Sequence, residues 1–201
     1  ALERIGEIFS AEAEVQLPNA AKPPLDRDIR FENVTFSYDG RPVLENVSFD
    51  IPAGSTFGIM GGTGSGKSTI TYLLNRLYEL PPGGGRITVG GVDIRDIDLY
   101  YLRRNVGLVL QEPFLFSKTI FENIDIAART GDLAQVRRCA SIAAIDDDIM
   151  SFPMGYDTVV GERGVTLSGG QKQRVAMART LMLKSPIMVF DDSMSNLDME
   201  T

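Results

Sequence analysis

The residues best suited to chemistry form one glycine-rich stretch, which runs Gly61-Gly62-Thr63-Gly64-Ser65-Gly66-Lys67-Ser68-Thr69. Its spacing matches the phosphate-binding pattern G-x-x-x-x-G-K-[ST]. Glycines allow several backbone N–H groups to point at one anion, and a Cβ there would block the approach. Lys67 adds a mobile positive charge for the outer phosphates, and the Ser68 hydroxyl is a hard oxygen ligand for Mg²⁺. The stretch therefore predicts a nucleoside triphosphate site that uses Mg²⁺, with Lys67 among its catalytic residues.

A second set of candidate residues closes a short apolar run. Residues 187–190 are all apolar, and Asp191 and Asp192 follow them. Two carboxylates are thus expected at the carboxyl end of a buried strand, where ligands of α/β sheets bind. One carboxylate can hold Mg²⁺ and the next can orient or deprotonate an attacking water. Taken alone, the pair also fits a strand that ends in a turn; beside a phosphate loop, it predicts Asp191 as a metal ligand and Asp192 as catalytic.

A third candidate is a helix start at Leu167-Ser168-Gly169-Gly170-Gln171. Ser168 is a natural N-cap, and the two glycines leave the first-turn N–H groups unobstructed for an anion. The helix is expected to run to about Lys184, before Ser185-Pro186, and to bury Val175, Ala178, Leu181 and Met182. Alone this start is weak as a functional signal. Its position just before the acidic strand makes it a strong one.

These residues need particular elements to position them. Residues 55–60 are expected to form a buried strand before the glycine-rich stretch, and residues 70–78 a helix after it. The continuous apolar runs 57–60, 106–110 and 187–190 are typical of parallel strands covered on both faces. The alternating runs 29–38, 47–51 and 86–89 are typical of an antiparallel sheet with one wet face. We therefore predict an α/β fold that combines a parallel nucleotide-binding core with an antiparallel layer.

The other segments carry weaker signals. Helices are expected over 119–126 and 132–145, the second capped by Asp132, and Asp146-Asp147-Asp148 is expected to be a solvated turn rather than a metal site. Residues 1–10 have the spacing of an amphipathic helix, and the proline-bearing segment 17–24 reads as a linker. This linker fits either a disordered terminus or a connection from a preceding domain.

Composition narrows the classes of function. The chain has 201 residues, 43% of them hydrophobic and 23% charged, as in ordinary soluble domains. Its formal net charge of −7 argues against a nucleic-acid partner. Cys139 is the single cysteine, which excludes an internal disulfide and fits a reducing compartment. No apolar run is long enough to span a membrane.

Taken together, the motifs closely resemble the ATP-binding domain of ABC transporters, specifically of exporters. The resemblance covers about residues 29–201 and leaves residues 1–28 as a tail and linker from a preceding transmembrane domain. It implies a RecA-like P-loop NTPase core with an antiparallel β subdomain and a helical signature subdomain. The residues that carry it are the phosphate loop Gly61–Thr69, Gln111, the signature Leu167–Gln171, Asp191-Asp192, and the loop Ser195-Asn196-Leu197-Asp198.

The resemblance also implies individual roles. Tyr38 would stack on adenine, and Gln111 would touch both Mg²⁺ and the attacking water. Two ATP-binding domains would dimerise head to tail, so that Ser168 and Gly170 reach the γ-phosphate held by the partner domain. Asp198 would signal between the two sites. The cofactors implied are ATP and Mg²⁺, and the location implied is the cytoplasmic face of a membrane, beside the transmembrane domain of the same chain.

The chain departs from the family pattern at the residue after Asp191, which is normally glutamate and is here Asp192. A carboxylate drawn back by roughly 1 Å can lower a rate about a hundredfold. An aspartate at this place is typical of the impaired half of heterodimeric, multidrug-type exporters, so we expect a non-identical partner that supplies the competent site. Asn196 also replaces the usual alanine, and the switch histidine of the family would lie beyond residue 201.

Three other readings stay open from the sequence. The first is a homodimeric exporter whose Asp192 is functional. The second is a non-transport ABC-type ATPase that acts on DNA or ribosomes, against which the negative charge counts. The third is a regulatory module that binds nucleotide without turnover.

Overall fold

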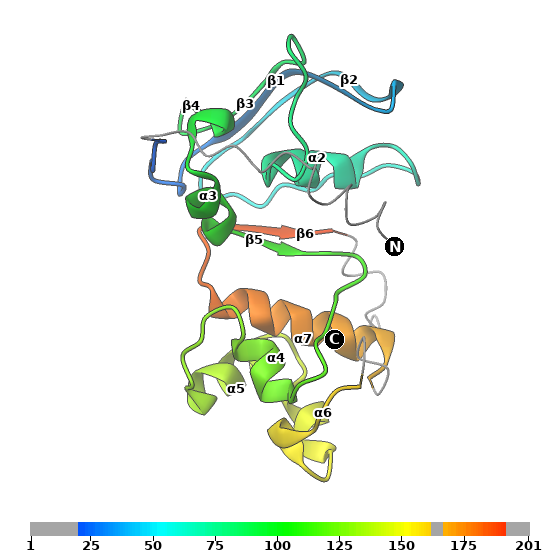
Figure 1. Ribbon diagram of the computed structural model, residues 1–201, viewed down its shortest axis with the longest axis vertical. Helices are drawn as coiled ribbons and strands as arrows, with labels where there is room; N and C mark the ends of the chain where they lie inside the picture. Colours follow the sequence, from blue (N-terminus) through cyan, green and yellow to red (C-terminus); the bar gives the residue numbers. More distant parts are fainter. Residues whose placement is uncertain (1–19, 162–166, 192–201) are drawn as a thin grey trace, which may run out of the picture.

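The computed structural model describes residues 20–161 and 167–191, which are arranged in layers (Figure 1). The upper layer is a four-stranded antiparallel sheet in the order β2-β1-β3-β4. Below it lie α2 and α3, then the parallel pair β5–β6, then α7, with α4, α5 and α6 beneath. The strands are β1 (Ile29–Tyr38), β2 (Arg41–Ile51), β3 (Arg86–Val89), β4 (Val92–Asp93), β5 (Val106–Val109) and β6 (Ile187–Phe190). The α-helices are α2 (Lys67–Leu74), α3 (Leu99–Asn105), α4 (Ile120–Asp125), α5 (Leu133–Ile142), α6 (Asp146–Ser151) and α7 (Gly169–Met182).

The antiparallel sheet follows from alternation in β1. Ile29 and Phe31, and then Val34 and Phe36, are buried while their neighbours are exposed, as a period of two requires within each half. The alternation shifts by one residue at Asn33, which adopts φ 50° where the pairing register with β2 also shifts. Asp39 and Gly40, at φ 47° and 77°, turn the chain into β2, the backbone twist that a two-residue hairpin favours. The predicted strands 29–38 and 86–89 are confirmed. The strand predicted over 47–51 is longer, because β2 pairs with β1 from Arg41 onward.

The parallel pair lies at the centre of the molecule. β5 and β6 pair in register, Val106 with Ile187 through Val109 with Phe190, which confirms two of the three predicted parallel strands. α7 packs closely on β5, since a Cβ on Gly107 would lie 2.7 Å from Cγ2 of Thr180. Both strands end on the side of the molecule where α2 and α7 begin (Figure 1), so one edge collects strand ends and helix starts.

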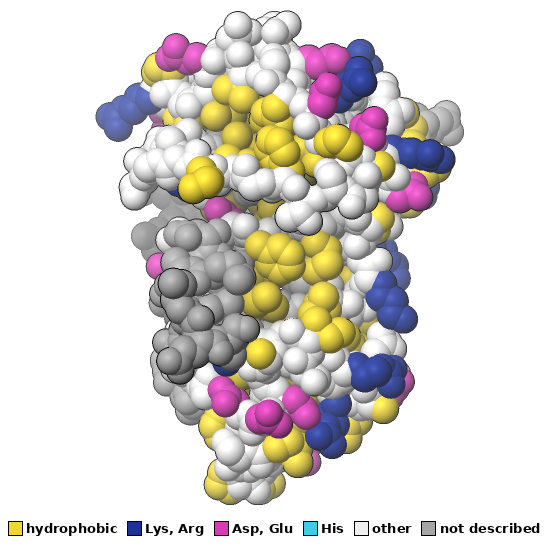
Figure 2. All heavy atoms as spheres, turned by 180° about the vertical axis from the view of Figure 1, so that it is seen from behind, with side chains coloured by type: hydrophobic (Ala, Val, Ile, Leu, Met, Phe, Trp, Pro, Cys, Tyr) yellow, Lys and Arg dark blue, Asp and Glu magenta, His cyan; other side chains and the backbone are white. Residues whose placement is uncertain are grey.

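The third predicted parallel strand, over residues 55–60, is wrong. The segment forms no strand, and Phe57 and Met60 are 44% and 96% exposed. A strand needs a hydrogen-bonded neighbour, and within residues 20–161 and 167–191 no segment pairs with this one. Instead Phe57 stacks on Phe49 of β2, with ring centroids 5.2 Å apart. Figure 2 shows hydrophobic side chains gathered across the middle of the rear face, between the sheet and the helical layer.

The helical layer has its own hydrophobic core. Fully buried side chains of α4, α5 and α7, among them Ile120, Ile124, Val136 and Val175, pack together. The predicted caps Asp132 and Ser168 are confirmed, because each side chain accepts a first-turn N–H. Thr119, predicted as the first residue of a helix, is instead the N-cap of α4, and its side chain accepts from Glu122 N. The helix predicted to end at Ile145 ends at Ile142, because Ala144 adopts φ 54°.

Two helix predictions need correction. The solvated turn expected at Asp146–Asp148 is the first turn of α6, where acidic side chains suit the helix N-terminus. Asp146 accepts hydrogen bonds from Arg137 and Tyr156. The helix expected over 70–78 stops at Leu74, since Arg76 adopts φ 50° and its guanidinium donates to the carbonyls of Ile94 and Ile97.

The first described residues, 20–25, pack against the rest of the described structure. Ala21 exchanges backbone hydrogen bonds with Asp96 and Asp98, and Leu25 is 3% exposed. The helix predicted over 1–10 lies outside the described residues, and the proposed domain boundary stays a prediction. Among residues 20–161 and 167–191, no helix combines the length and the hydropathy needed to cross a bilayer.

Candidate nucleotide-binding site

The glycine-rich loop leads directly into α2. Gly66 is the N-cap of this helix at φ 90°, and Gly64 adopts φ 80°, a region that favours glycine. Gly66 also packs closely: a Cβ there would lie 2.7 Å from Cδ2 of Leu44 and 3.2 Å from the carbonyl oxygen of Val43. Lys67 Nζ donates to the carbonyls of Gly61 and Gly62, at 2.8 and 2.9 Å. The loop therefore gathers backbone N–H groups, one cation and a helix N-terminus, which is an anion-binding arrangement.

Ser68 and Asp191 meet across the molecule. Ser68 Oγ donates to Asp191 Oδ1 at 3.0 Å although the two residues are 123 positions apart. Asp191 is 5% exposed, and within the described residues its Oδ2 has no hydrogen-bond partner. A buried carboxylate oxygen without a partner is costly, and hard oxygens of this kind are what Mg²⁺ prefers. The pair therefore fits a magnesium ion, with Ser68 and Asp191 as ligands.

Tyr38 lies beside the loop. Its hydroxyl donates to Oγ1 of Thr69 at 3.3 Å, and its ring meets Phe36 and Tyr78 edge to face, with centroids 4.9 and 5.0 Å apart. The ring is half-buried, so part of it faces outward at the end of β1. Tyr72 joins this aromatic group, and burial, then the charge of Asp191, raises the pKa of its hydroxyl. Tyr72 therefore stays neutral beside the carboxylate.

Gln111 follows β5 by two residues and is exposed. Because β5 and β6 are parallel and in register, Gln111 and Asp191 leave the sheet at the same edge. Its main-chain oxygen accepts a hydrogen bond from Gln173 Nε2 at 2.5 Å. The structure thus brings Ser68 and Asp191 into contact and places Gln111 at the same edge of the sheet.

The signature residues do not join this cluster. Ser168 and Gln171 form a capping box, in which Ser168 Oγ accepts from Gln171 N and Gln171 Oε1 accepts from Ser168 N. Leu167 is buried, whereas Ser168 and Gly169 are exposed and Gly170 is half-buried. The start of α7 is thus open toward solvent and available to a ligand held elsewhere. Asp192 and Ser195–Asp198 lie outside the described residues, so their roles stay predictions.

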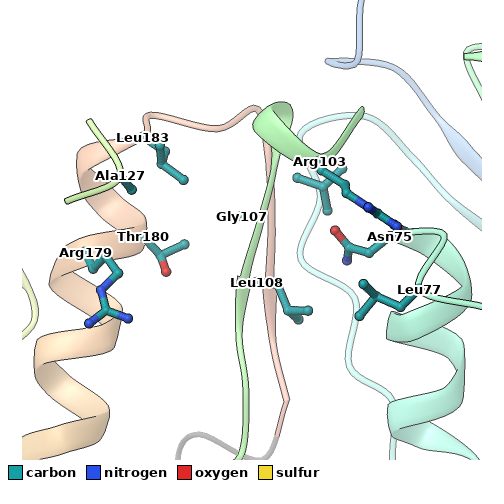
Figure 3. A pocket seen from close by; sticks show the side chains of 10 residues that line it. Asn75, Leu77, Arg103, Gly107, Leu108, Ala127, Arg179, Thr180 and Leu183 are labelled. Carbon is teal, nitrogen blue, oxygen red and sulfur yellow. The ribbon is translucent and has the colours of Figure 1, made fainter. Parts of the chain in front are cut away.

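A hollow of about 290 Å³ lies away from these residues, between the end of α2, β5 and the end of α7 (Figure 3). Arg103 and Arg179 at its rim donate to main-chain carbonyls, Arg103 to Asn75 and Arg76 and Arg179 to Phe114 and Asn123. Of the residues predicted for the site, none that the structure describes lines this hollow. The nucleotide site is therefore an open edge rather than this hollow.

A family comparison decides the identity of this arrangement, since the model of the ABC transporter family matches residues 44–195. The chain belongs to the ABC transporter family. Its fold is that of an ABC ATPase domain, a P-loop NTPase core with mixed parallel and antiparallel sheets. Domains of this family that resemble those of exporters are ATPases.

Two curated proteins and one solved structure illustrate what this ABC domain is similar to. A mitochondrial iron–sulfur clusters transporter of Oryzias latipes is 47% identical over 90% of this chain and 24% of its own length. The alpha-hemolysin translocation ATP-binding protein of Escherichia coli O157:H7 is 41% identical over 100% of this chain and 28% of its own length. The structure of a bacterial Atm1-family ABC exporter with ATP bound has a TM-score of 0.91 and 42% identity, covering 99% of this chain and 35% of that one. The chain thus spans about a quarter to a third of these relatives.

Sequence reasoning missed several residues that position the ABC site. Gln173 contacts Gln111, Asp148 accepts a hydrogen bond from Gln171 Nε2, and Tyr78 contacts Tyr38. Half-buried Arg179 connects α7 to α4 and the segment before it, and desolvation lowers the pKa of its guanidinium. The apolar spacing of the helix gave no signal for Gln173, because that spacing predicted burial only at Val175, Ala178, Leu181 and Met182.

Proposed function

We propose that this chain binds and hydrolyses ATP to power export of a substrate across a membrane. The observation that carries the proposal is the contact between Ser68 Oγ and Asp191 Oδ1, with Oδ2 buried and unpartnered in the described part of the chain. Ser68 and Asp191 would hold Mg²⁺, which would neutralise charge on the phosphates. Lys67 and the N–H groups of Gly61–Thr69 bind the phosphates, Tyr38 stacks on adenine, and Gln111 orients the attacking water.

The test of this observation is a magnesium titration of ATP turnover in the full-length protein. Ser68→Ala removes one metal ligand and should raise the Mg²⁺ concentration for half-maximal turnover about tenfold or more. Ser55→Ala is the matched control, because the one bond that Ser55 Oγ donates among the described residues goes to the Pro52 carbonyl, outside the loop. Equal magnesium requirements for the two variants would contradict the assignment of the metal site.

We further propose that the active unit is a head-to-tail pair of ATP-binding domains. The exposed start of α7 supports this, because a helix N-terminus and the Ser168 hydroxyl suit a γ-phosphate held by a partner domain. The transmembrane domain is proposed to precede this domain in the same chain. The names of the relatives, an iron–sulfur clusters transporter and an alpha-hemolysin translocation ATP-binding protein, support export across a membrane. We place the domain on the cytoplasmic face.

Asp192 leads us to propose that the two ATP sites of the assembled transporter are unequal. Its shorter side chain would leave this chain's own site slow, and the competent site would use Ser168 and Gly170 with the phosphate loop and glutamate of a non-identical partner. ATP turnover of the assembled transporter should therefore change little in Asp192→Asn. If Asp192→Asn abolishes turnover while the partner's glutamate is dispensable, this asymmetric arrangement is wrong and a homodimeric exporter with a functional Asp192 takes its place.

A further inference from the structure

Gln173 is a buried polar residue to which the mechanism above assigns no role. It lies on α7, five positions after Ser168, and is 1% exposed. Its Nε2 donates to the main-chain oxygen of Gln111, 62 residues earlier in the chain. One helix of the helical layer thus contacts the segment that follows β5, at the residue proposed to orient water.

The oxygen of the Gln173 amide shows why this contact matters. Its Oε1 is buried and, within the described residues, has no hydrogen-bond partner. An unsatisfied buried acceptor costs about 1–3 kcal/mol. Methionine has a similar length and would fill the same space without that cost. The bond that Nε2 donates is therefore the physical reason for an amide at this position.

α7 can couple the movement of residues at its two ends, because it is one continuous helix. It is a single helix of 14 residues, with Ser168 capping its start. Further along it, Thr180 packs against Gly107 of β5 so closely that a Cβ on this glycine would lie 2.7 Å away from Cγ2 (Figure 3). The helix is therefore fixed on β5 near its end and on Gln111 near its start.

We propose that Gln173 is a positioning residue that holds the main chain at Gln111 in a fixed place relative to the start of α7. Gln111 at the chain's own magnesium site and Ser168 at the site of the partner domain then move together. The magnesium part of this inference rests on the proposed function, whereas the contact itself does not. It assigns to one buried amide the connection between Gln111 and the exposed start of α7.

The first test is hydrogen–deuterium exchange in the full-length protein. Gln173→Met removes the donor and keeps the volume, and Gln173→Glu keeps the acceptor but removes the donor. Both should speed exchange of the amides at residues 110–112 several-fold, because the segment loses its anchor on α7. Thr180→Val is the matched control: it is isosteric, lies on the same helix and, of the bonds described, loses only the bond to the Ala176 carbonyl. Unchanged exchange in both Gln173 variants, or equal acceleration in Thr180→Val, would overturn the proposal.

The second test is a double-mutant cycle on the magnesium dependence of ATP turnover. Gln173→Met should raise the half-maximal Mg²⁺ concentration several-fold in the native background and not at all beside Gln111→Ala, because the two changes remove one function. Additive effects would show a merely structural role for Gln173 and overturn the coupling. If Gln111→Ala leaves the Mg²⁺ requirement unchanged while Gln173→Met still speeds exchange, the contact stands and the proposed role of Gln111 fails.

Discussion

Alanine substitution of two glycines in the phosphate loop should separate backbone strain from close packing. Gly64 and Gly66 both have positive φ, at 80° and 90°. A Cβ on Gly64 meets nothing within 4 Å, whereas one on Gly66 meets Leu44 at 2.7 Å and the Val43 carbonyl at 3.2 Å. The left-handed backbone costs a non-glycine residue about 1–2 kcal/mol. Overpacking a tight site adds about 1–3 kcal/mol, and Leu44 is only 3% exposed, so it has little room to move.

Gly64→Ala should therefore lower the free energy of unfolding by about 1–2 kcal/mol, and Gly66→Ala by at least about 1 kcal/mol more. Urea denaturation, followed by circular dichroism, measures both. Gly62→Ala is the control, because its φ is not positive and nothing lies within 4 Å of its Cβ; it should stay within about 0.5 kcal/mol of the native chain. Equal losses for Gly64→Ala and Gly66→Ala would refute the packing of the loop against β2.

Three further predictions concern ionisable groups. Hydrogen bonds from Lys118 and Thr119 lower the pKa of Glu122 to about 2. The ionised carboxylate therefore contributes its full stabilisation above its ordinary pKa, and this stabilisation is lost as pH falls through about 2. In Glu122→Gln, the free energy of unfolding should decrease less steeply with falling pH over that window. The Arg137 guanidinium lowers the pKa of Asp146, so NMR titration of Arg137→Met should show this pKa rising toward its ordinary value. Burial raises the pKa of the Cys139 thiol, so a thiol reagent should label it far more slowly in the native protein than in urea.

Local patterns predicted those elements whose signals are complete within a few residues. The bounds of β1 and β3 and the side-chain caps at Asp132 and Ser168 depend on near neighbours in sequence, and all were predicted correctly. The failures lie where the outcome depends on distant groups. The apolar run 55–60 lacks a partner strand among the described residues, and α2 ends early because Arg76 reaches carbonyls 18 and 21 residues away.

The candidate site also contains some contacts that the sequence predicts and others that it does not. The contact between Ser68 and Asp191 spans 123 residues, yet it was predictable, because a phosphate loop and an acidic strand end converge at one edge of a parallel sheet. Gln173 and Tyr78 were not predictable in this way. A buried glutamine or a tyrosine after a helix has many possible partners, and only the packing of α7 on β5, or of α2 on β1, selects Gln111 and Tyr38. Topology therefore brings the reacting groups together, whereas side-chain packing, which sequence patterns do not encode locally, holds them in place.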